Sequence, residues 1–349
     1  MLYAGVSWNA AGYEVAVVDD DGRLVGTPVG FAATRTDDLI AYLMNDPIDG
    51  RRRETAGRVA VESTNGILDG RMMSAGLNVH RVDPHALGER PVLGAVSALE
   101  IACAARDRPG PTLLVRNRGT QTGREPLLER WIASSAERTA AMAAAGRCLE
   151  HGDRDRLEVA LTFDDGPLRP YTTQLLDVLE RYQAPATFFC VGMNAAAGAE
   201  DLVRMREQGH RVANHTWSHP FLPELTRAQV RAQVELTAER LARVSGSAPP
   251  TLVRPPYGAR TPEVMDWLGE IGSRIALWDV APDDWAMPGA DVIAARVLEQ
   301  VSPGSVILLH DGGGDRSQTV AALPAIIEGL LAGGYRIVLV DDLVPVPAG

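Results

Sequence analysis

Two short segments of the chain carry residue types that could hold a metal ion and hydrolyse a bond. In residues 162–166, two adjacent carboxylates, Asp164 and Asp165, follow an apolar run and precede a glycine. Farther along come His215 and His219, which would share one face if the segment between them is helical. One carboxylate and two imidazoles leave coordination positions open for water and substrate, so the second carboxylate is free to act as a base. This combination predicts a metal-dependent hydrolase.

Three later segments could complete such a site. They are residues 254–258, which read Arg-Pro-Pro-Tyr-Gly, the pair Asp284 and Trp285, and residues 308–311, which read Leu-Leu-His-Asp. Taken singly, each could be an ordinary turn or a rigid loop. All of these segments, however, lie at or near the ends of predicted strands, and such ends face one mouth in a βα barrel. We therefore expect one shared site.

The elements that would position these segments alternate from Leu157 onward, which favours an α/β fold with a barrel-like parallel sheet. We expect strands at 157–163, 186–191, 211–213, 251–254, 275–278, 306–309 and 336–340. We expect helices at 171–182, 201–208, 227–244, 262–271, 291–299 and 319–332.

The first part of the chain predicts a smaller α/β domain. Its expected strands are 5–8, 13–18, 58–62 and 78–82, its expected helices begin after Thr36 and cover 66–75, and residues 19–22 form a hairpin turn. An alanine-rich helix over 126–148 leads to a charged stretch at 151–156. These patterns divide the chain into an accessory domain (1–125), a helical linker (126–155) and a catalytic domain (156–349).

Composition limits the class of protein. A chain of 349 residues suggests two domains, and its net charge of −11 argues against a general nucleic-acid-binding surface. Its apolar runs are too short to cross a membrane, and no basic segment precedes an apolar one at the start. Three widely spaced cysteines fit a reducing compartment, so we expect a cytoplasmic protein.

The five segments resemble, in order and approximate spacing, those of the NodB-homology polysaccharide deacetylases, carbohydrate esterase family 4. The resemblance runs from about Leu157 to the end of the chain and implies a distorted (β/α) barrel. It also implies that Asp164 is the catalytic base and that Asp165, His215 and His219 hold one divalent ion. Zn²⁺ is the expected ion, with Co²⁺, Ni²⁺ or Mn²⁺ as alternatives.

The same resemblance implies four further catalytic roles. Arg254 would orient the base, the backbone N–H of Tyr257 would help bind the oxyanion, Asp284 would tune the acid, and His310 would be that acid. The imidazolium form of His310 needs a neighbouring carboxylate near neutral pH, and Asp284 can supply one.

Substrate contacts follow from the resemblance too. Trp285 would line the groove and Leu308 the pocket. Ala281 stands where the family often has an aspartate, so the polar lining of the groove differs at that position.

The N-terminal part resembles the start of DEDD-type insertion-sequence transposases at residues 5–8, 19–22, 59–64 and 75–79. This resemblance implies a ribonuclease H-like domain. Ser7 stands at the position of an essential aspartate, and Glu62 at that of the second acid. Because a lone carboxylate cannot hold two metal ions for phosphodiester cleavage, nuclease activity is not expected. Dimerisation, giving a homo-oligomer, or covering of the active-site mouth is the favoured role.

The expected reaction is metal-dependent hydrolysis of an amide. Its simplest form is N-deacetylation of an acetylated amino sugar, an oligosaccharide or a small biosynthetic intermediate. One alternative is a non-sugar amide or cyclic imide on the same site, whose opening would release no acetate. An alternative of another class is a nucleic-acid-binding module with a tethered deacetylase domain, which the acidic composition and Ser7 both argue against.

Overall fold

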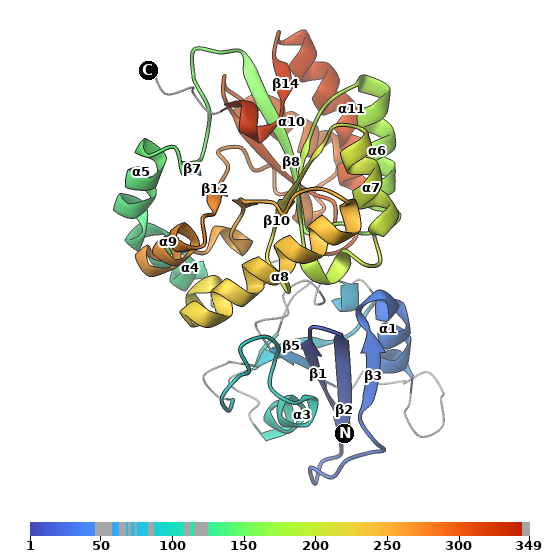
Figure 1. Ribbon diagram of the computed structural model, residues 1–349. Coiled ribbons are helices and arrows are strands. Elements are labelled where there is room, and N and C mark those ends of the chain that lie inside the picture. Colours follow the sequence, from blue (N-terminus) through green and yellow to red (C-terminus); the bar gives the residue numbers. More distant parts are fainter. Residues whose placement is uncertain are drawn as a thin grey trace.

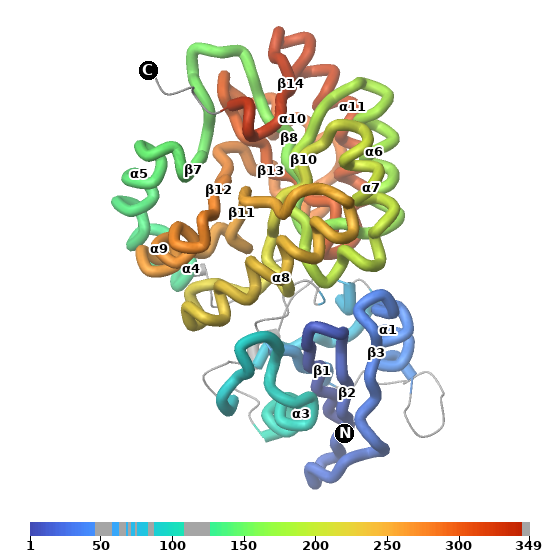
Figure 2. Tube along the Cα trace, in the orientation of Figure 1, coloured from blue at the N-terminus to red at the C-terminus, as the bar shows by residue number. Residues whose placement is uncertain are grey.

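The computed structural model describes residues 1–45, 58–62, 68, 71–73, 75–82, 87–107, 112–114 and 125–343. These residues form two sheets, each packed against a hydrophobic core, and the two units lie against each other (Figures 1 and 2). Within these ranges, no helix is both long enough and apolar enough to span a bilayer.

The N-terminal sheet has the strand order β3-β2-β1-β4-β5-β6. Its strands are β1 (Tyr3–Asn9), β2 (Gly12–Val18), β3 (Val29–Ala32), β4 (Arg58–Glu62), β5 (Val79–Val82) and β6 (Thr112–Leu114). The first three strands pair antiparallel, β1, β4 and β5 run parallel, and β6 returns antiparallel to β5.

Helices cover both faces of this sheet. The short turn η1 (Ala33–Arg35) leads into α1 (Thr36–Met44), whose Leu39 and Leu43 share a core cluster with Val6 on β1. On the other face, α3 (Ala98–Asp107) packs close to β1 at Gly5. A Cβ at Gly5 would lie 2.1 Å from the Ala98 carbonyl oxygen, so only glycine permits this approach.

The second sheet is curled, and all its neighbouring strands pair parallel, in the order β13-β8-β9-β10-β11-β12-β7 with β14 also on β8. Its strands are β7 (Cys148–Leu149), β8 (Glu158–Asp164), β9 (Thr187–Cys190), β10 (Arg211–Asn214), β11 (Leu252–Val253), β12 (Arg274–Ala276), β13 (Val306–His310) and β14 (Arg336–Val338). Its helices are α4 (Glu125–Ser134), α5 (Ala136–Ala144), α6 (Tyr171–Tyr182), α7 (Ala199–Glu207), α8 (Arg227–Ser245), α9 (Pro262–Glu270), α10 (Ala290–Gln300) and α11 (Ser317–Ala332). Short 3₁₀ turns are η3 (Gly192–Asn194), η4 (Leu222–Glu224), η5 (Pro256–Gly258), η6 (Asp284–Ala286) and η7 (Val340–Leu343).

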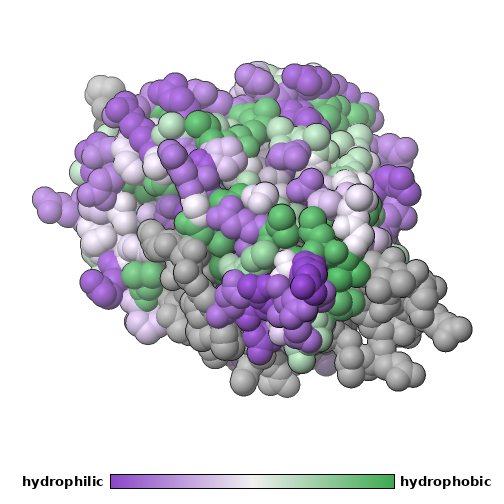
Figure 3. Space-filling view, turned by 90° about the horizontal axis from the view of Figure 1, so that it is seen from below, coloured by the Kyte–Doolittle hydropathy of each residue, from purple (hydrophilic) through white to green (hydrophobic). Residues whose placement is uncertain are grey.

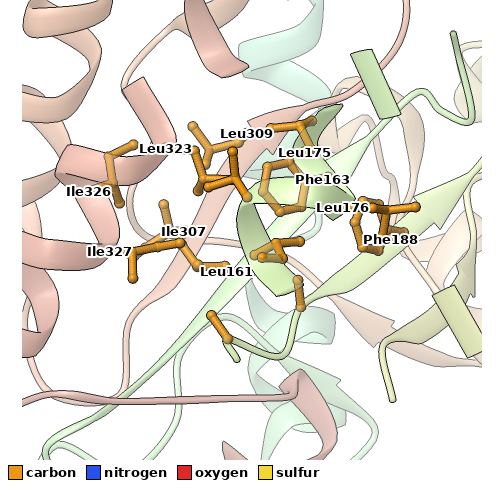
Figure 4. Close-up of a cluster of buried hydrophobic side chains, with 14 of the residues drawn as sticks. Leu161, Phe163, Leu175, Leu176, Phe188, Ile307, Leu309, Leu323, Ile326 and Ile327 are labelled. Carbon is orange, nitrogen blue, oxygen red and sulfur yellow. The ribbon is translucent and has the colours of Figure 1, made fainter. Parts of the chain in front are cut away.

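Alternate side chains of β8 point either into the hydrophobic core or toward the inside of the curled sheet. Leu161 and Phe163 point outward into the core formed with α6 and α11, where Phe163 stacks on Phe188 at 5.1 Å between ring centroids (Figure 4). Each such fully buried side chain stabilises the fold by about 1.5–3 kcal/mol relative to exposure. Because successive side chains of a strand face opposite ways, Thr162 and Asp164 face the inside of the curled sheet.

The expected α/β barrel preceded by a smaller α/β domain is the observed architecture, and most element bounds lie within two residues of the prediction. The helix predicted over 126–148 is wrong in its length. It is broken at the buried Ser135, and Gly146, at φ +68°, ends it after α5. Cys148 and Leu149 then form β7, which pairs with β12, because sheet hydrogen bonding outweighs helix propensity there.

Part of the segment predicted as a linker therefore belongs to the curled sheet. The boundaries 1–125, 126–155 and 156–349 stay predictions, as does the ribonuclease H-like identity of the first domain. The helix predicted over 66–75 falls largely outside the described residues.

Candidate active site

The register of two neighbouring strands brings the predicted base and acid together. β8 and β13 run parallel, and their pairing sets His310 beside Asp164 at the C-terminal ends of both strands. Val306 and Ala160 share the inner core cluster, so the alternate residues of these strands, including Asp164 and His310, face the same interior. Residues far apart in sequence thus meet at one mouth of the sheet, as predicted.

Asp165, His215 and His219 form a buried cluster next to this pair. The Asp165 Oδ1 atom lies 3.1 Å from His219 Nε2 and 3.5 Å from His215 Nε2. One ligand atom from each residue lies within 4.8 Å of the others, and among the described residues no hydrogen-bond donor satisfies the buried Asp165 Oδ1. A buried oxygen and two imidazole nitrogens that converge in this way fit a divalent cation such as Zn²⁺.

The protonation states of this cluster also suit a metal. Burial alone would raise the pKa of Asp165, but the neighbouring His219 and His215 outweigh it and hold that pKa well below its ordinary value. Burial lowers the pKa of His219, and Asp165 only partly offsets this. A carboxylate and a neutral imidazole are the forms that bind metal ions.

The segment that carries His215 and His219 is not helical. They lie in an irregular loop after β10, where Thr216 (φ 67°) and His219 (φ 60°) adopt left-handed backbone conformations. Two buried amides hold this loop. Asn214 Oδ1 accepts from the Thr216 N–H at 2.8 Å, and Gln233 Oε1 accepts from the N–H groups of Trp217 (2.8 Å) and Ser218 (3.0 Å). These bonds replace helical ones, yet the two imidazole rings lie only 4.8 Å apart between centroids.

The orientation of His215 is set by the next loop. Its Nδ1 lies 2.8 Å from the carbonyl oxygen of Arg254. Because a carbonyl can only accept, Nδ1 donates to it, and Nε2 faces the other groups of the cluster. A backbone acceptor behind a ligating histidine commonly fixes the tautomer in metal sites.

Arg254 holds Asp164 in place through a buried ion pair. Its side chain is fully buried, and Nη1 donates to Asp164 Oδ1 at 2.6 Å and to Thr162 Oγ1 at 2.9 Å. The other nitrogens donate to the carbonyl oxygens of Ala276 (3.2 Å) and Leu277 (3.0 Å). Burial lowers the pKa of Arg254, and Asp164 opposes this shift. Four of the five guanidinium N–H groups thus donate to these partners, which aim one edge at the carboxylate.

Asp284 and His310 form the second charged pair. Asp284 Oδ1 lies 2.7 Å from His310 Nδ1, while Oδ2 accepts from the His310 backbone N–H (2.9 Å) and from Thr319 Oγ1 (2.8 Å). Burial lowers the pKa of His310, but Asp284 outweighs burial and raises it. Burial would raise the pKa of Asp284, and His310 reverses that shift. The pair therefore favours an imidazolium beside a carboxylate.

Tyr257 lies at the rim of the same site, in η5. Its backbone is left-handed (φ 60°), its ring stacks on Phe221 at 4.0 Å between centroids, and the His219 ring meets it edge-on at 4.5 Å. Trp285 is half-buried in η6, and Leu308 is buried on the inner side of β13. The oxyanion and substrate-contact roles of these three residues stay predictions.

Strained backbone is concentrated in this site. Asp165 (φ 78°), Thr216, His219 and Tyr257 are all non-glycine residues with left-handed conformations. Each costs on the order of 1–3 kcal/mol, so the surrounding bonds must hold these loops against relaxation. Strain of this kind is typical of functional sites.

Asp311 is a buried carboxylate to which sequence reasoning gave no role. It accepts from the Gly166 N–H at 3.0 Å and from Thr172 Oγ1 at 2.7 Å, so it fastens the turn that carries Asp164 and Asp165. Burial, with the nearby carboxylates, raises the pKa of Asp311 to about 7. Because Asp311 directly follows His310, its position in the sequence could have indicated a role in the site. No sequence pattern pointed to Asn214, Gln233 or Thr319.

The sequence of this chain is similar to those of known proteins. The family model for polysaccharide deacetylase matches residues 151–276. Chitooligosaccharide deacetylase of Bradyrhizobium sp. is 42% identical over 191 residues, which covers 51% of this chain and 87% of that protein. Peptidoglycan-N-acetylmuramic acid deacetylase PdaC of Bacillus subtilis is 39% identical over 191 residues, but this chain spans only 39% of that protein's length.

A solved structure agrees with these relatives. The crystal structure of the Bc1960 peptidoglycan N-acetylglucosamine deacetylase matches this chain with a TM-score of 0.56 and 36% sequence identity. The match covers 58% of this chain and 95% of the chain in that structure. The region matched by the family model contains Asp164, Asp165, both clustered histidines and Arg254. The chain therefore belongs to the polysaccharide deacetylases, carbohydrate esterase family 4.

Proposed function

We propose that this protein is a metal-dependent deacetylase that hydrolyses the acetamide of an acetylated amino sugar or oligosaccharide. The observation that carries the proposal is the convergence of Asp165, His215 and His219 beside the Asp164–Arg254 pair. Names of the relatives support the substrate class, since they are deacetylases of chitooligosaccharide and of peptidoglycan sugars.

A divalent ion held by Asp165, His215 and His219 would polarise the amide carbonyl and make a bound water more acidic. Side chains of the protein transfer the protons. Asp164 Oδ1 is engaged by Arg254, while Oδ2 faces the cluster, 3.6 Å from His215 Nε2. Asp164 is thus placed to take the water proton as a general base.

His310 is suited to return a proton to the leaving nitrogen. Asp284 holds Nδ1 and raises the pKa of His310, so the imidazolium persists to higher pH than in a free histidine. In the proposed reaction the C–N bond breaks, the acyl carbon gains the water oxygen, and the nitrogen gains the proton. The products are acetate and a free amine.

A non-sugar amide or a cyclic imide is the second candidate substrate. Ala281 favours it, because this half-buried position lacks the acidic side chain that is frequent in the family. Zn²⁺ is the ion that we propose, since the two imidazoles and one carboxylate are ligands it prefers.

We also propose a reducing, cytoplasmic setting, because Cys103, Cys148 and Cys190 are all free thiols. A homo-oligomer formed through the N-terminal domain stays a prediction. Figure 3 shows a face on which hydrophilic and hydrophobic residues are interspersed. Leu24 and Val92 are among the exposed apolar residues of the described N-terminal part, and neither identifies a partner.

Acetate release by the zinc-loaded protein tests the proposal. The panel holds N-acetylglucosamine, short chitooligosaccharides and N-acetylated small metabolites, and Asp164→Ala is the blank. We expect acetate from the sugars that is absent in the blank. A stoichiometrically metal-bound protein that releases none, but opens a cyclic imide or cleaves a non-acetyl amide, would replace the first candidate by the second.

A further inference from the structure

The N-terminal domain packs directly on the loops that carry the candidate metal ligands. Trp217, which lies between His215 and His219, is buried in the same hydrophobic cluster as Val6 and Trp8 of β1. Val191 and Met193, which follow β9, belong to that cluster as well. The helix α8 runs along the boundary between the two units (Figure 1), and its Gln229 donates to the Pro91 carbonyl oxygen at 3.1 Å.

A buried ion pair fastens the same boundary. Arg90 Nε lies 2.9 Å from Glu62 Oε1, and Glu62 is fully buried. Glu62 Oε2 also accepts from the Val96 N–H at 3.3 Å. Arg90 then reaches the barrel, where Nη2 donates to the Glu224 carbonyl oxygen at 3.4 Å. The acid at the predicted nuclease position is therefore used to join the two domains.

Arg81 brings a guanidinium from this domain to the rim of the site. It lies on β5, is only 3% exposed, and its Nη2 donates to the Tyr257 hydroxyl at 3.1 Å. Its guanidinium carbon lies 5.8 Å from the centroid of the Phe221 ring and 6.0 Å from that of Tyr257. Cation–π attraction of this kind adds to the hydrogen bond.

The Tyr257 side chain is thereby held at both ends. Phe221 stacks on its ring, His219 meets the ring edge, and Arg81 binds its hydroxyl. Because the Tyr257 backbone adopts a strained left-handed conformation, its peptide plane depends on what anchors the side chain. A polar donor aimed at a developing oxyanion works only in its correct orientation.

We propose that Arg81 is a positioning residue of the deacetylase site, acting through Tyr257, so that the N-terminal domain completes the site. The inference rests on the proposed function, because it assigns Arg81 an effect on that reaction. Arg81 need not touch substrate. It fixes the tyrosine whose backbone N–H serves the oxyanion.

A double-mutant cycle on the full-length zinc-loaded protein tests this inference. Its variants are Arg81→Met, Tyr257→Phe and the two combined, with Arg81→Lys as the conservative variant. Arg71→Met is the matched control, since Arg71 pairs with Asp37 inside the N-terminal domain at 2.6 Å. Steady-state acetate release gives kcat and KM, and zinc titration checks that the metal site is intact.

We expect Arg81→Met and Tyr257→Phe each to lower kcat about 10-fold, less than the 10²–10³ lost with a whole oxyanion donor. KM and zinc affinity should change little, the double variant should match the single ones, and Arg81→Lys should recover part of kcat. Arg71→Met should behave as wild type. If Arg81→Met does not fold, Tyr257→Phe removes the same hydrogen bond with almost no change of volume.

The outcomes separate the two proposals. An active wild type whose Arg81→Met and Tyr257→Phe variants keep full kcat would overturn the positioning role and leave the deacetylase function standing. Fully multiplicative losses in the double variant would also overturn it. A wild type that releases no acetate from any substrate would remove the proposed function, and the inference with it.

Discussion

The two sheets of this protein place polar residues at equivalent points and use them differently. In the barrel, the parallel neighbours β8 and β13 end in Asp164 and His310. In the N-terminal sheet, the parallel neighbours β1 and β4 carry Ser7 and Glu62 near their ends. The first pair faces a cluster of candidate metal ligands, whereas Glu62 is neutralised by Arg90 in the domain boundary. What an acid at a strand end does is thus decided by its partner.

The largest expected effects concern the barrel. His215→Ala should lose both bound zinc and turnover, because it removes one of three ligands. Asp164→Asn should keep the metal and lower kcat about 10³-fold, within the range for a general base. Zinc content by atomic absorption and acetate release measure the two. Full metal occupancy in His215→Ala would refute the ligand assignment.

The next effect concerns the acid. Asp284 raises the pKa of His310, and the proposed acid is active only when protonated. Asp284→Asn should therefore lower the pKa of His310, so the loss of activity with rising pH should begin at a lower pH than in the wild type. The maximal kcat should also fall about 10²-fold. The pH profile of kcat measures this shift. A basic limb that stays in place would exclude His310 as the group that titrates there.

The same comparison shows what sequence could predict. The barrel strands and the five segments were predictable because apolar runs and turn residues are local features. The conformation of the loop that carries His215 and His219 could not be predicted, because no sequence pattern shows that the Asn214 and Gln233 side chains hydrogen-bond to it. The contact of Arg81 with Tyr257 joins residues 176 positions apart, so only the folded chain reveals it.

A further prediction concerns Glu62, the acid of the N-terminal sheet, and removes its charge. Glu62→Gln leaves Arg90 as a poorly paired, largely buried cation, which should destabilise the protein by about 3 kcal/mol. Its kcat should stay within about threefold of wild type, because Glu62 serves the boundary and no proton transfer. Denaturant unfolding and acetate release supply both values. A kcat loss as large as that of Asp164→Asn, in a folded variant, would contradict the division of roles.

The smallest expected change comes from placing a second acid beside Glu62. Ser7→Asp should create no Mg²⁺-dependent cleavage of single- or double-stranded DNA or RNA, although it places a carboxylate on β1 beside Glu62. Two-metal phosphodiester cleavage needs carboxylates free to bind ions, and Arg90 already occupies Glu62 Oε1 at 2.9 Å. The new buried charge should also destabilise the fold by about 1–3 kcal/mol. Cleavage above that of wild type would show that the N-terminal sheet can assemble a metal site and that the pairing with Arg90 does not determine what Glu62 does.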